Sequence, residues 1–335
     1  TWRHLIDNPK DSQWVLYFPM TRGVVRAIDA VQDYVNKKMG FKPEKWLAYG
    51  ASKRGWITWL VGAVDDRVVG IAPMVSNLLN MKQGLQNHFM GLGGWTFAFK
   101  DYCDVNLTAY LPTNQIDPLV ALIDPIGYAK NLTMPKLIVS TTGDEFFLPT
   151  DMDAWWPGPF GDNTYNLYLS DAEHSMATGI VAFIEGLSGF WQGIILGDKM
   201  PKFSFSIDNS TGTIHIETDT MPFDATLNHA DSLPKTDAHP ARRDYRLIRG
   251  DTEADPCDQG IEACLVPILW WSERVGPTSH ENGMYHYELS MPYPEEGVWR
   301  GFLGDFQFPG PTPTTAYRFT TYVSTIPQTY PFKKC

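Results

Sequence analysis

The spacing of apolar residues changes along the chain, and this change predicts two kinds of structure. In residues 19–39 apolar side chains recur every three or four positions, which predicts an amphipathic helix that begins near Pro19 and ends at Gly40. Short, almost continuous apolar runs then follow, and such runs are typical of parallel strands that are covered on both faces. They occupy residues 45–49, 68–75, 136–142 and 165–169.

Helical patterns separate these runs, at residues 55–64 and again at 179–196. Strand, helix and strand in this order predict a doubly wound α/β sheet. Residues 76–118 show no clean period and are rich in Asn, Gly, Met and aromatic residues. We expect them to form a lid-like insertion, or an ordinary helical one. The first domain is predicted to span residues 1–197.

Beyond residue 198 the pattern becomes one of short strand-like runs separated by Gly and Pro turns, which predicts a C-terminal β-sandwich, Ig-like in type, over residues 198–335. The runs are 203–207, 213–218, 263–271, 285–291, 299–308 and 317–324.

The most informative local motif is GASKRGW at residues 50–56, between a predicted strand and a predicted helix. A serine at such a sharp turn, flanked by small residues, is the layout of a nucleophile elbow, in which the hydroxyl leaves the sheet and the helix N-terminus faces a developing oxyanion. The usual pattern has Gly two residues after the serine, whereas here Arg54 stands there. Ser52 is therefore the candidate nucleophile, and the backbone N–H of Lys53 a candidate oxyanion donor. The plain alternative is a serine that only caps the helix.

An acid and a histidine follow in the order that such a sheet requires. Asp144 comes after the run 136–142, with Glu145 as the adjacent rival, and His174 comes after the run 165–169. Serine, then acid, then histidine, each just past a strand end, is the triad order of α/β-hydrolases. The imidazole would take the serine proton, and the carboxylate would fix its tautomer. Either acid could instead cap a turn. The remaining histidines, His88, His215, His229 and His286 among them, are expected on the surface or in satisfied polar pockets.

The motif and its surroundings resemble the PhoPQ-activated pathogenicity-related family, which includes secreted autocrine proliferation repressors. Matching pieces include Thr58-Trp59-Leu60, Asp66-Arg67-Val68, Gly143-Asp144-Glu145-Phe146 and Glu173-His174-Ser175. The resemblance covers most of the chain and is strongest from about residue 19 to 195. It implies an α/β-hydrolase-like domain, a β-rich domain after it, and a hydrolase-type Ser, Asp and His set.

Four further side chains are candidates for substrate binding or packing. Lys53 and Arg54 place positive charge at a helix N-terminus, against the helix dipole. Arg54 either pairs with a buried carboxylate, or both cations attract an anionic substrate group. Trp155 and Trp156 either wall an acyl or aromatic pocket or pack in the core. The aromatic residues of the second domain similarly suggest sugar binding or an ordinary sandwich core.

Composition narrows the class of partner. The formal net charge of −11 disfavours nucleic acid and anionic membranes, which need basic patches, and no apolar run approaches bilayer length. The spacing of the four cysteines does not suggest a metal site, so neither a metal nor an organic cofactor is expected. The chain starts at Thr1 without a signal-like segment, and only 51 residues precede Ser52. We therefore expect upstream sheet strands, and with them the second oxyanion donor, to be missing.

The cysteines and the N-glycosylation sequons indicate whether the protein is secreted or cytosolic. We predict a local disulfide between Cys257 and Cys264, the alternative being two free thiols in a cytosolic protein. Three N-glycosylation sequons begin at Asn106, Asn131 and Asn209. With the family resemblance, they favour a secreted glycoprotein.

Three functions remain open at this point. The first is a secreted serine hydrolase that acts on a small ester or peptide substrate. The second is a secreted proliferation-repressing signal on a hydrolase scaffold, with a cell-surface receptor as its partner. The third is a carbohydrate esterase.

Overall fold

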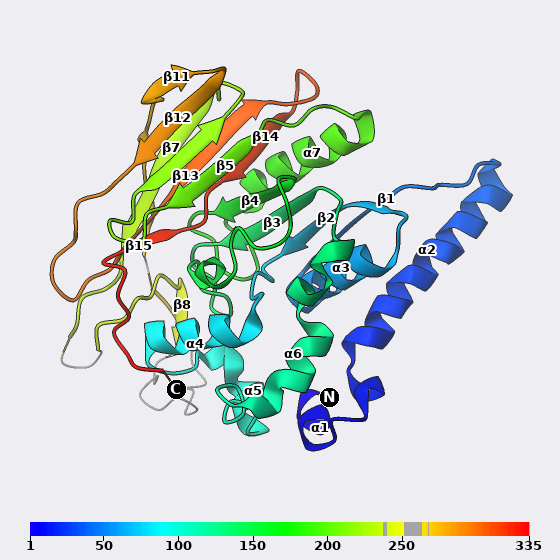
Figure 1. Cartoon of the computed structure of the whole chain (residues 1–335), viewed down its shortest axis with the longest axis horizontal. Coiled ribbons are helices and arrows are strands. Elements are labelled where there is room, and N and C mark those ends of the chain that lie inside the picture. Colours follow the sequence, from blue (N-terminus) through cyan, green and yellow to red (C-terminus); the bar gives the residue numbers. More distant parts are fainter. Residues whose placement is uncertain (237–239, 251–262, 267, 335) are drawn as a thin grey trace.

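The computed structural model describes residues 1–236, 240–250, 263–266 and 268–334. Its N-terminal half is built on four parallel strands that lie side by side in chain order (Figure 1). They are β1 (Trp46–Ala51), β2 (Val68–Met74), β3 (Lys136–Thr141) and β4 (Thr164–Leu169). Each falls on an apolar run of the sequence, so the predicted mostly parallel sheet is confirmed.

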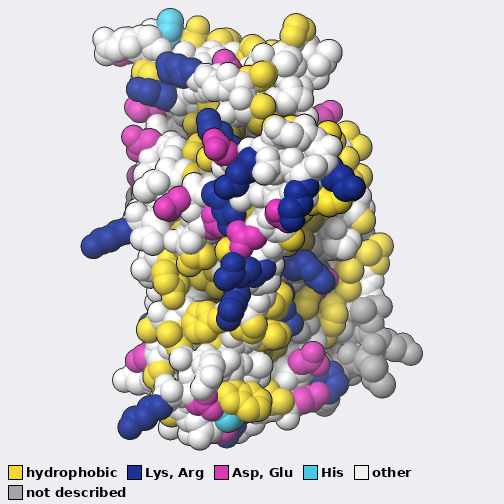
Figure 2. Space-filling model, turned by 90° about the vertical axis from the view of Figure 1, so that its right-hand side faces the viewer, with side chains coloured by type: hydrophobic (Ala, Val, Ile, Leu, Met, Phe, Trp, Pro, Cys, Tyr) yellow, Lys and Arg dark blue, Asp and Glu magenta, His cyan; other side chains and the backbone are white. Residues whose placement is uncertain are grey.

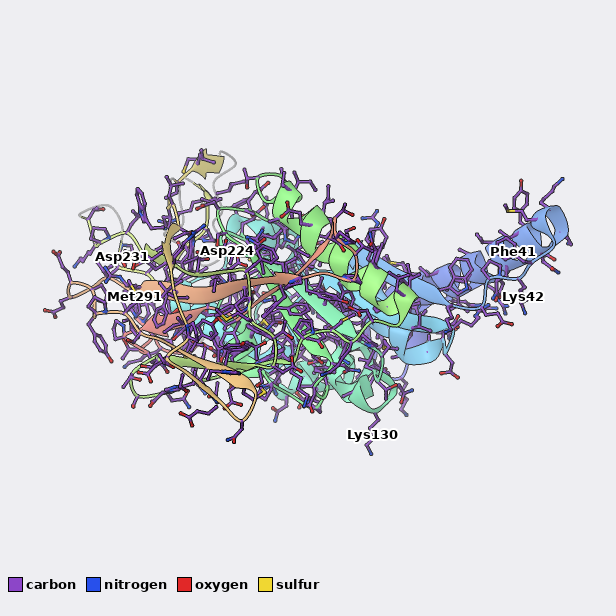
Figure 3. All side chains as sticks on the ribbon, turned by 90° about the horizontal axis from the view of Figure 1, so that it is seen from above. Phe41, Lys42, Lys130, Asp224, Asp231 and Met291 are labelled. Carbon is purple, nitrogen blue, oxygen red and sulfur yellow. The ribbon has the colours of Figure 1, made fainter. Side chains whose placement is uncertain are left out.

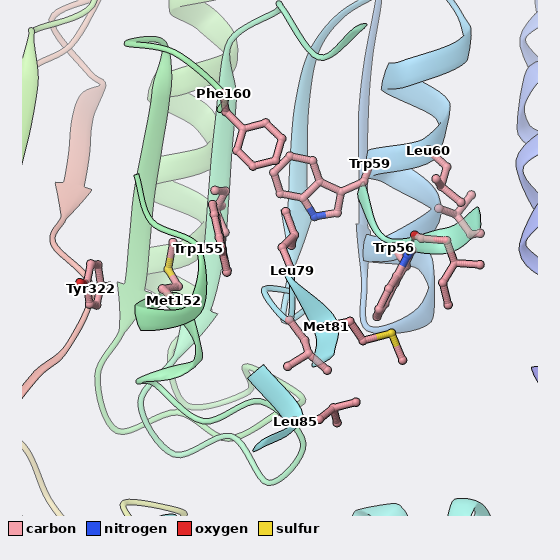
Figure 4. Packing of buried hydrophobic residues seen from close by; sticks show 14 of the residues in the cluster. Trp56, Trp59, Leu60, Leu79, Met81, Leu85, Met152, Trp155, Phe160 and Tyr322 are labelled. Carbon is pink, nitrogen blue, oxygen red and sulfur yellow. Dashed lines mark hydrogen bonds between the residues drawn. The ribbon is translucent and has the colours of Figure 1, made fainter. Parts of the chain in front are cut away.

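Helices cover both faces of this sheet, because alternate strand residues point to opposite sides. On one face, α3 (Lys53–Val64) packs its Trp56 and Trp59 into a core shared with Ile71 and Ile138. On the other face, α7 (Ile180–Leu196) packs against Leu137, Val139 and Leu167. Figure 4 shows the first of these cores: Trp59 is fully buried, and its ring lies 5.3 Å from that of Phe160.

The helix α2 (Tyr17–Met39) extends the predicted helix by two residues at its start and ends at Gly40, where φ is +74°. It contacts α3 at one end, while its other end projects from the body, with Phe41 and Lys42 at the tip (Figure 3). On the face shown in Figure 2, Lys and Arg side chains alternate with Asp and Glu down the middle of the view, with hydrophobic side chains on either side. Arg67 bonds Asp29 on α2 and Asp65 at the end of α3.

The predicted lid-like stretch is helical and largely packed. Between β2 and β3 the chain forms α4 (Met81–Leu92), η2 (Phe97–Phe99), α5 (Lys100–Asp104), η3 (Asn114–Ile116), α6 (Asp117–Ile123) and η4 (Pro125–Asn131). Two short N-terminal elements, α1 (Trp2–Asp7) and η1 (Ser12–Trp14), precede α2, and η5 (Asp151–Ala154) follows β3. Among the described residues, no helix combines the length and apolar character that crossing a bilayer requires.

The C-terminal half is rich in antiparallel strands, as predicted. One sheet contains β11 (Ser279–Glu281), β12 (Met284–Leu289), β6 (Ile214–Thr218) and β5 (Phe203–Ile207). It shares a core, including Phe203, Ile216 and Phe306, with a second set of strands. That set is β14 (Ala316–Thr320), β13 (Arg300–Pro309), β7 (Asp224–Asp231), β10 (Trp271–Arg274) and β15 (Ser324–Ile326). The strands β8 (Ile248–Gly250) and β9 (Ala263–Leu265) form a separate two-stranded sheet.

The two halves share one sheet, which the sequence pattern did not predict. Thr320 of β14 pairs antiparallel with Asn166 of β4, so the parallel sheet continues directly into the C-terminal strands (Figure 1). The helix α7 lies across this junction. The boundary placed at residues 197 and 198 therefore does not coincide with a break in the sheet.

Candidate active site

Ser52 lies at the turn between β1 and α3, and its backbone has the strained conformation of an elbow. Its φ is +57° and its ψ is −126°, a region that residues with a side chain seldom adopt. The turn is held to the next strand because the Ser52 N–H donates to the Met74 carbonyl at 2.9 Å. The strain keeps the serine at the carboxyl end of the sheet, where its side chain lines a pocket.

The glycines of the motif are required by close backbone approach. A Cβ on Gly50 would lie 2.7 Å from the Arg54 carbonyl oxygen, and one on Gly55 would lie 2.6 Å from that of Met74. Real Cβ atoms do not approach backbone oxygens so closely. The position of Arg54 has no such contact requirement, because its side chain is exposed. This explains how the motif tolerates arginine where the usual pattern has glycine.

Asp144 and His174 are joined by hydrogen bonds between the ends of β3 and β4. The Nδ1 atom of His174 lies 2.9 and 3.0 Å from the two carboxylate oxygens of Asp144. The same carboxylate also accepts the backbone N–H groups of Phe146 and Phe147 at 2.7 and 3.0 Å. Asp144 is 1% exposed, so these donors hold a buried acceptor in one orientation.

The structure distinguishes Asp144 from its rival. Glu145 contacts His174 as well, but its Oε2 accepts the backbone N–H of that residue at 3.1 Å, and the imidazole is not involved. Asp144 is thus the acid that contacts the imidazole, whereas Glu145 bonds the backbone of His174.

The other ring nitrogen of His174, Nε2, is buried and has no partner among the described residues. The aromatic rings of Phe146 and Phe147 lie 4.5 and 5.8 Å from the imidazole. Both phenylalanines also line the pocket that contains Ser52. His174 therefore contacts two rings that line the pocket of Ser52, although no hydrogen bond joins Ser52 and His174 among the described residues.

The pocket beside Ser52 has a volume of about 400 Å³ and mainly apolar walls. Several walls come from the segment predicted as a lid, which supplies Leu78, Met81, Leu85, Phe99, Tyr102 and Leu111. Lys53, Arg54 and Asp101 are its charged lining residues. Such a cavity suits an acyl or aromatic group next to a reacting carbonyl.

The predicted pairing of Arg54 with a buried carboxylate is wrong. Both Lys53 and Arg54 are exposed, and in the part of the chain that the structure describes neither side chain forms an ion pair. Both side chains line the pocket, together with Asp101. The backbone N–H of Lys53 belongs to the first turn of α3, where such groups have no partner within the helix.

Local charges perturb the titration of His174. Burial lowers its pKa, but the hydrogen bond to Asp144 and the negative charges of Asp144, Glu145 and Glu173 outweigh burial and raise the pKa above the ordinary value of 6.5. The pKa of Glu145 is also raised, because the carboxyl is buried and lies near Asp144. The acidic surroundings therefore favour the imidazolium form.

Neither Trp155 nor Trp156 lines the pocket beside Ser52. The structure therefore does not support the prediction that they wall an acyl or aromatic pocket there. Trp155 is 5% exposed, and its Nε1 donates to the Asn77 carbonyl at 2.8 Å, as expected of a core residue. Trp156 lines a different cavity, and its ring stacks on that of Phe205 with the centroids 5.2 Å apart.

Two buried groups were not identified from the sequence. Asp151, in η5, is fully buried, neither of its carboxylate oxygens has a partner among the described residues, and burial together with the charge of Asp144 raises its pKa well above the usual range. His88 was expected in a satisfied or exposed position. It is 1% exposed between Trp95 and Phe99, and burial lowers its pKa to about 3, so it is neutral.

The predicted covalent features are only partly within the described residues. Cys257 lies outside them, so its disulfide with Cys264 stays a prediction, and no disulfide is present in the described part. Asn106, Asn131 and Asn209 are all exposed. The amide of Asn131, however, donates to the Ala63 carbonyl at 3.0 Å, a bond that a glycan at this nitrogen would disturb.

The strand order and the elbow define the class of this protein as α/β-hydrolase-like, with a β-rich half joined to the same sheet. Residues 1–246 match the family described as PhoPQ-activated pathogenicity-related protein, and the chain belongs to that family. It is also 32% identical, over its whole length, to autocrine proliferation repressor protein A of Dictyostelium discoideum. The chain spans 66% of the length of that relative.

Similar solved structures include an esterase of Pyrococcus furiosus, at 12% identity and a TM-score of 0.35, with 52% of this chain and 60% of that one covered. An enol-lactonase of Burkholderia xenovorans is similar at 14% identity and a TM-score of 0.31, with 52% and 73% covered. At these scores the similarity carries no weight for activity.

Proposed function

We propose that this protein is a secreted serine hydrolase that cleaves an ester or peptide bond. The observation that carries the proposal is the strained backbone of Ser52 at the mouth of an apolar pocket, with the bonded Asp144 and His174 pair behind two phenylalanines of the same pocket. Strain of this kind at a strand-to-helix turn persists where function requires it.

The chemistry would follow from the positions of these groups. His174 Nε2 takes the proton of Ser52 as the serine Oγ forms a bond to the substrate carbonyl carbon, and Asp144 holds the other ring nitrogen. The negative charge on the carbonyl oxygen is stabilised by the Lys53 N–H. As the tetrahedral intermediate collapses, the imidazolium gives its proton to the leaving oxygen or nitrogen. Water then attacks the acyl-enzyme by the same route in reverse.

This proposal requires Ser52 and His174 to approach each other when substrate binds. Catalytic hydrogen bonds are often long in the absence of ligand and shorten in the complex. The Phe146 ring contacts the imidazole and lines the pocket of Ser52. The exposed cations Lys53 and Arg54 favour a substrate with an anionic group near the carbonyl.

Labelling with a fluorophosphonate probe tests the proposed nucleophile. We expect covalent modification of the native protein and none of the Ser52→Ala variant, because the probe reacts with an activated serine. Ser210, an exposed serine in a turn, gives the matched control, and Ser210→Ala should label like the native protein. Labelling that survives in Ser52→Ala, or that is absent from the native protein, would contradict the proposal.

The pH dependence of kcat/KM should report the raised pKa of His174. Because the general base must be neutral, activity is expected to fall as the pH drops through a midpoint above 6.5. Glu145→Gln removes one of the negative charges that raise this pKa, so its midpoint should lie at lower pH. A pH–rate profile of both proteins on a p-nitrophenyl ester checks this. A midpoint below 6.5, or one that Glu145→Gln leaves in place, would speak against the assignment of His174.

A second candidate is a signalling protein on the same scaffold. The whole-length similarity to a proliferation repressor favours it, and so does the absence of a hydrogen bond between Ser52 and His174 among the described contacts. The two candidates differ in one measurement. If Ser52→Ala retains a growth-inhibiting effect on cells and the native protein resists the probe, the signalling function is the correct one.

A further inference from the structure

A second cavity, of about 580 Å³, has none of its described lining residues in common with the pocket of Ser52. It is formed where the N-terminal insertion meets the β-rich half, near α4 and β15 in Figure 1. The insertion contributes Gln83 and Asn87 from α4, and the loop around η5 contributes Asp153 and Trp156. The strand β5 contributes Phe205 opposite them. The volume is that of a small-molecule site.

Aromatic rings form much of its wall. Trp156 and Phe205 stack with ring centroids 5.2 Å apart and planes only 7° from parallel. Tyr322 and Tyr330 complete this aromatic lining from the C-terminal segment. Because Trp156 and Phe205 cover each other's facing surfaces, a sugar ring can pack its apolar C–H face only on the parts of these rings that line the cavity.

An ion pair lies among these rings. Arg243 is 4% exposed, its Nη2 donates to Asp153 Oδ2 at 3.1 Å, and its guanidinium carbon lies 4.6 Å from the centre of the Tyr330 ring. Among the described lining residues these two are the only ones with a formal charge, and their charges cancel. A neutral ligand therefore suits the cavity better than an ionised one.

Unused hydrogen-bonding capacity points to a ligand as well. The Nε atom of Arg243 and the Nε1 atom of Trp156 are buried and have no acceptor among the described residues. Buried donors are normally bonded, so each exception needs an explanation. The remaining polar lining is made of neutral amides and hydroxyls, which both donate and accept: Gln83, Asn87, Ser206, Asn209, Ser324, Thr325 and Gln328.

We propose that this cavity binds a neutral saccharide of one or two sugar rings. Hydroxyl groups satisfy donors and acceptors alike, the aromatic walls take the apolar face of the ring, and the compensated ion pair leaves no charge to be matched. The site is independent of the reaction at Ser52. On a hydrolase it would hold a glycan-bearing substrate or surface while the ester or peptide bond is cleaved in the other pocket.

The experiment titrates the whole protein with maltose, cellobiose, mannobiose, galactobiose and chitobiose, followed by tryptophan fluorescence and by calorimetry. We expect at least one to bind, and Trp156→Ala to weaken that binding about tenfold, as the loss of one aromatic stacking surface would. Trp271→Ala is the matched control, because Trp271 is an exposed tryptophan of the same half that does not line the cavity. It should bind as the native protein does.

Two further variants make the outcome decisive. Asp153→Asn keeps the shape of the side chain but leaves Arg243 uncompensated, so it should weaken the neutral disaccharide and favour its uronic acid counterpart. Ser52→Ala should bind normally, which separates this site from the proposed nucleophile. The proposal is overturned if none of the five disaccharides binds, or if Trp156→Ala and Trp271→Ala weaken binding equally.

Discussion

Replacing Asp144 by Asn is expected to lower kcat/KM about 10⁴-fold, because a neutral amide no longer fixes the tautomer of the imidazole or stabilises its protonated form. The carboxylate accepts bonds from His174 Nδ1 and from two backbone N–H groups, so an amide placed there would also direct its own N–H at one of these donors. Steady-state kinetics on an activated ester measures the loss. Circular dichroism shows whether the variant is folded.

Glu145→Gln is the matched comparison, since the two acids are adjacent and both touch His174. Glu145 accepts only the backbone N–H of that residue, a bond that an amide oxygen can still accept, so we expect a loss of less than about tenfold. Equal losses in the two variants would mean that the acid side chains support the loop and not the imidazole. A fully active Asp144→Asn would remove Asp144 from the mechanism altogether.

The variant Gly189→Ala is expected to lower the free energy of unfolding by about 3 kcal/mol, at the upper end of what overpacking costs. Gly189 lies on α7 where this helix crosses β14, and a Cβ built there would be 1.9 Å from the carbonyl oxygen of Ala316. The obstacle is backbone, so the helix must move away from the strand that joins the two halves of the sheet. Urea denaturation followed by tryptophan fluorescence measures the change.

Gly23→Ala is the control for helix propensity. Gly23 lies within α2, and a Cβ there meets nothing within 4 Å, so alanine should be neutral or stabilise by up to about 1 kcal/mol. If Gly189→Ala proves as stable as Gly23→Ala, then α7 does not pack on β14 as closely as described.

The strands that the sequence predicted correctly have an apolar run, as in β3, or apolar and polar residues in alternation, as in β5. The strand β7 was missed, although it lies between β13 and β10 in the sheet. Its sequence, DATLNHAD, begins and ends with Asp. Thr226 is its only β-branched residue, and it contains no Phe, Tyr or Trp. Pairing with β13 over eight residues holds this strand in the sheet. A local sequence pattern does not indicate such pairing, because it depends on residues far apart in the chain.

The residues of the candidate site were likewise only partly predictable from the sequence. Ser52, Asp144 and His174 could be selected from the sequence, because each follows an apolar run in the order that a parallel sheet needs, and the carboxyl ends of such strands meet at one edge. The sequence favoured Asp144 as the acid but left Glu145 as an adjacent rival. Neighbouring residues differ only in the direction of their side chains, and only the folded loop directs one of them to Nδ1.

By itself, the sequence determined the parallel sheet, the elbow at Ser52 and the β-rich character of the second half, since all three rest on local periodicity and short-range turn chemistry. Only the tertiary structure decided that β14 extends the parallel sheet, that Arg54 forms no ion pair among the described residues, and that Trp156 lines a cavity other than that of Ser52. The physical reason is that these features depend on contacts between residues far apart in the chain, and each such contact is fixed by packing that no local pattern encodes.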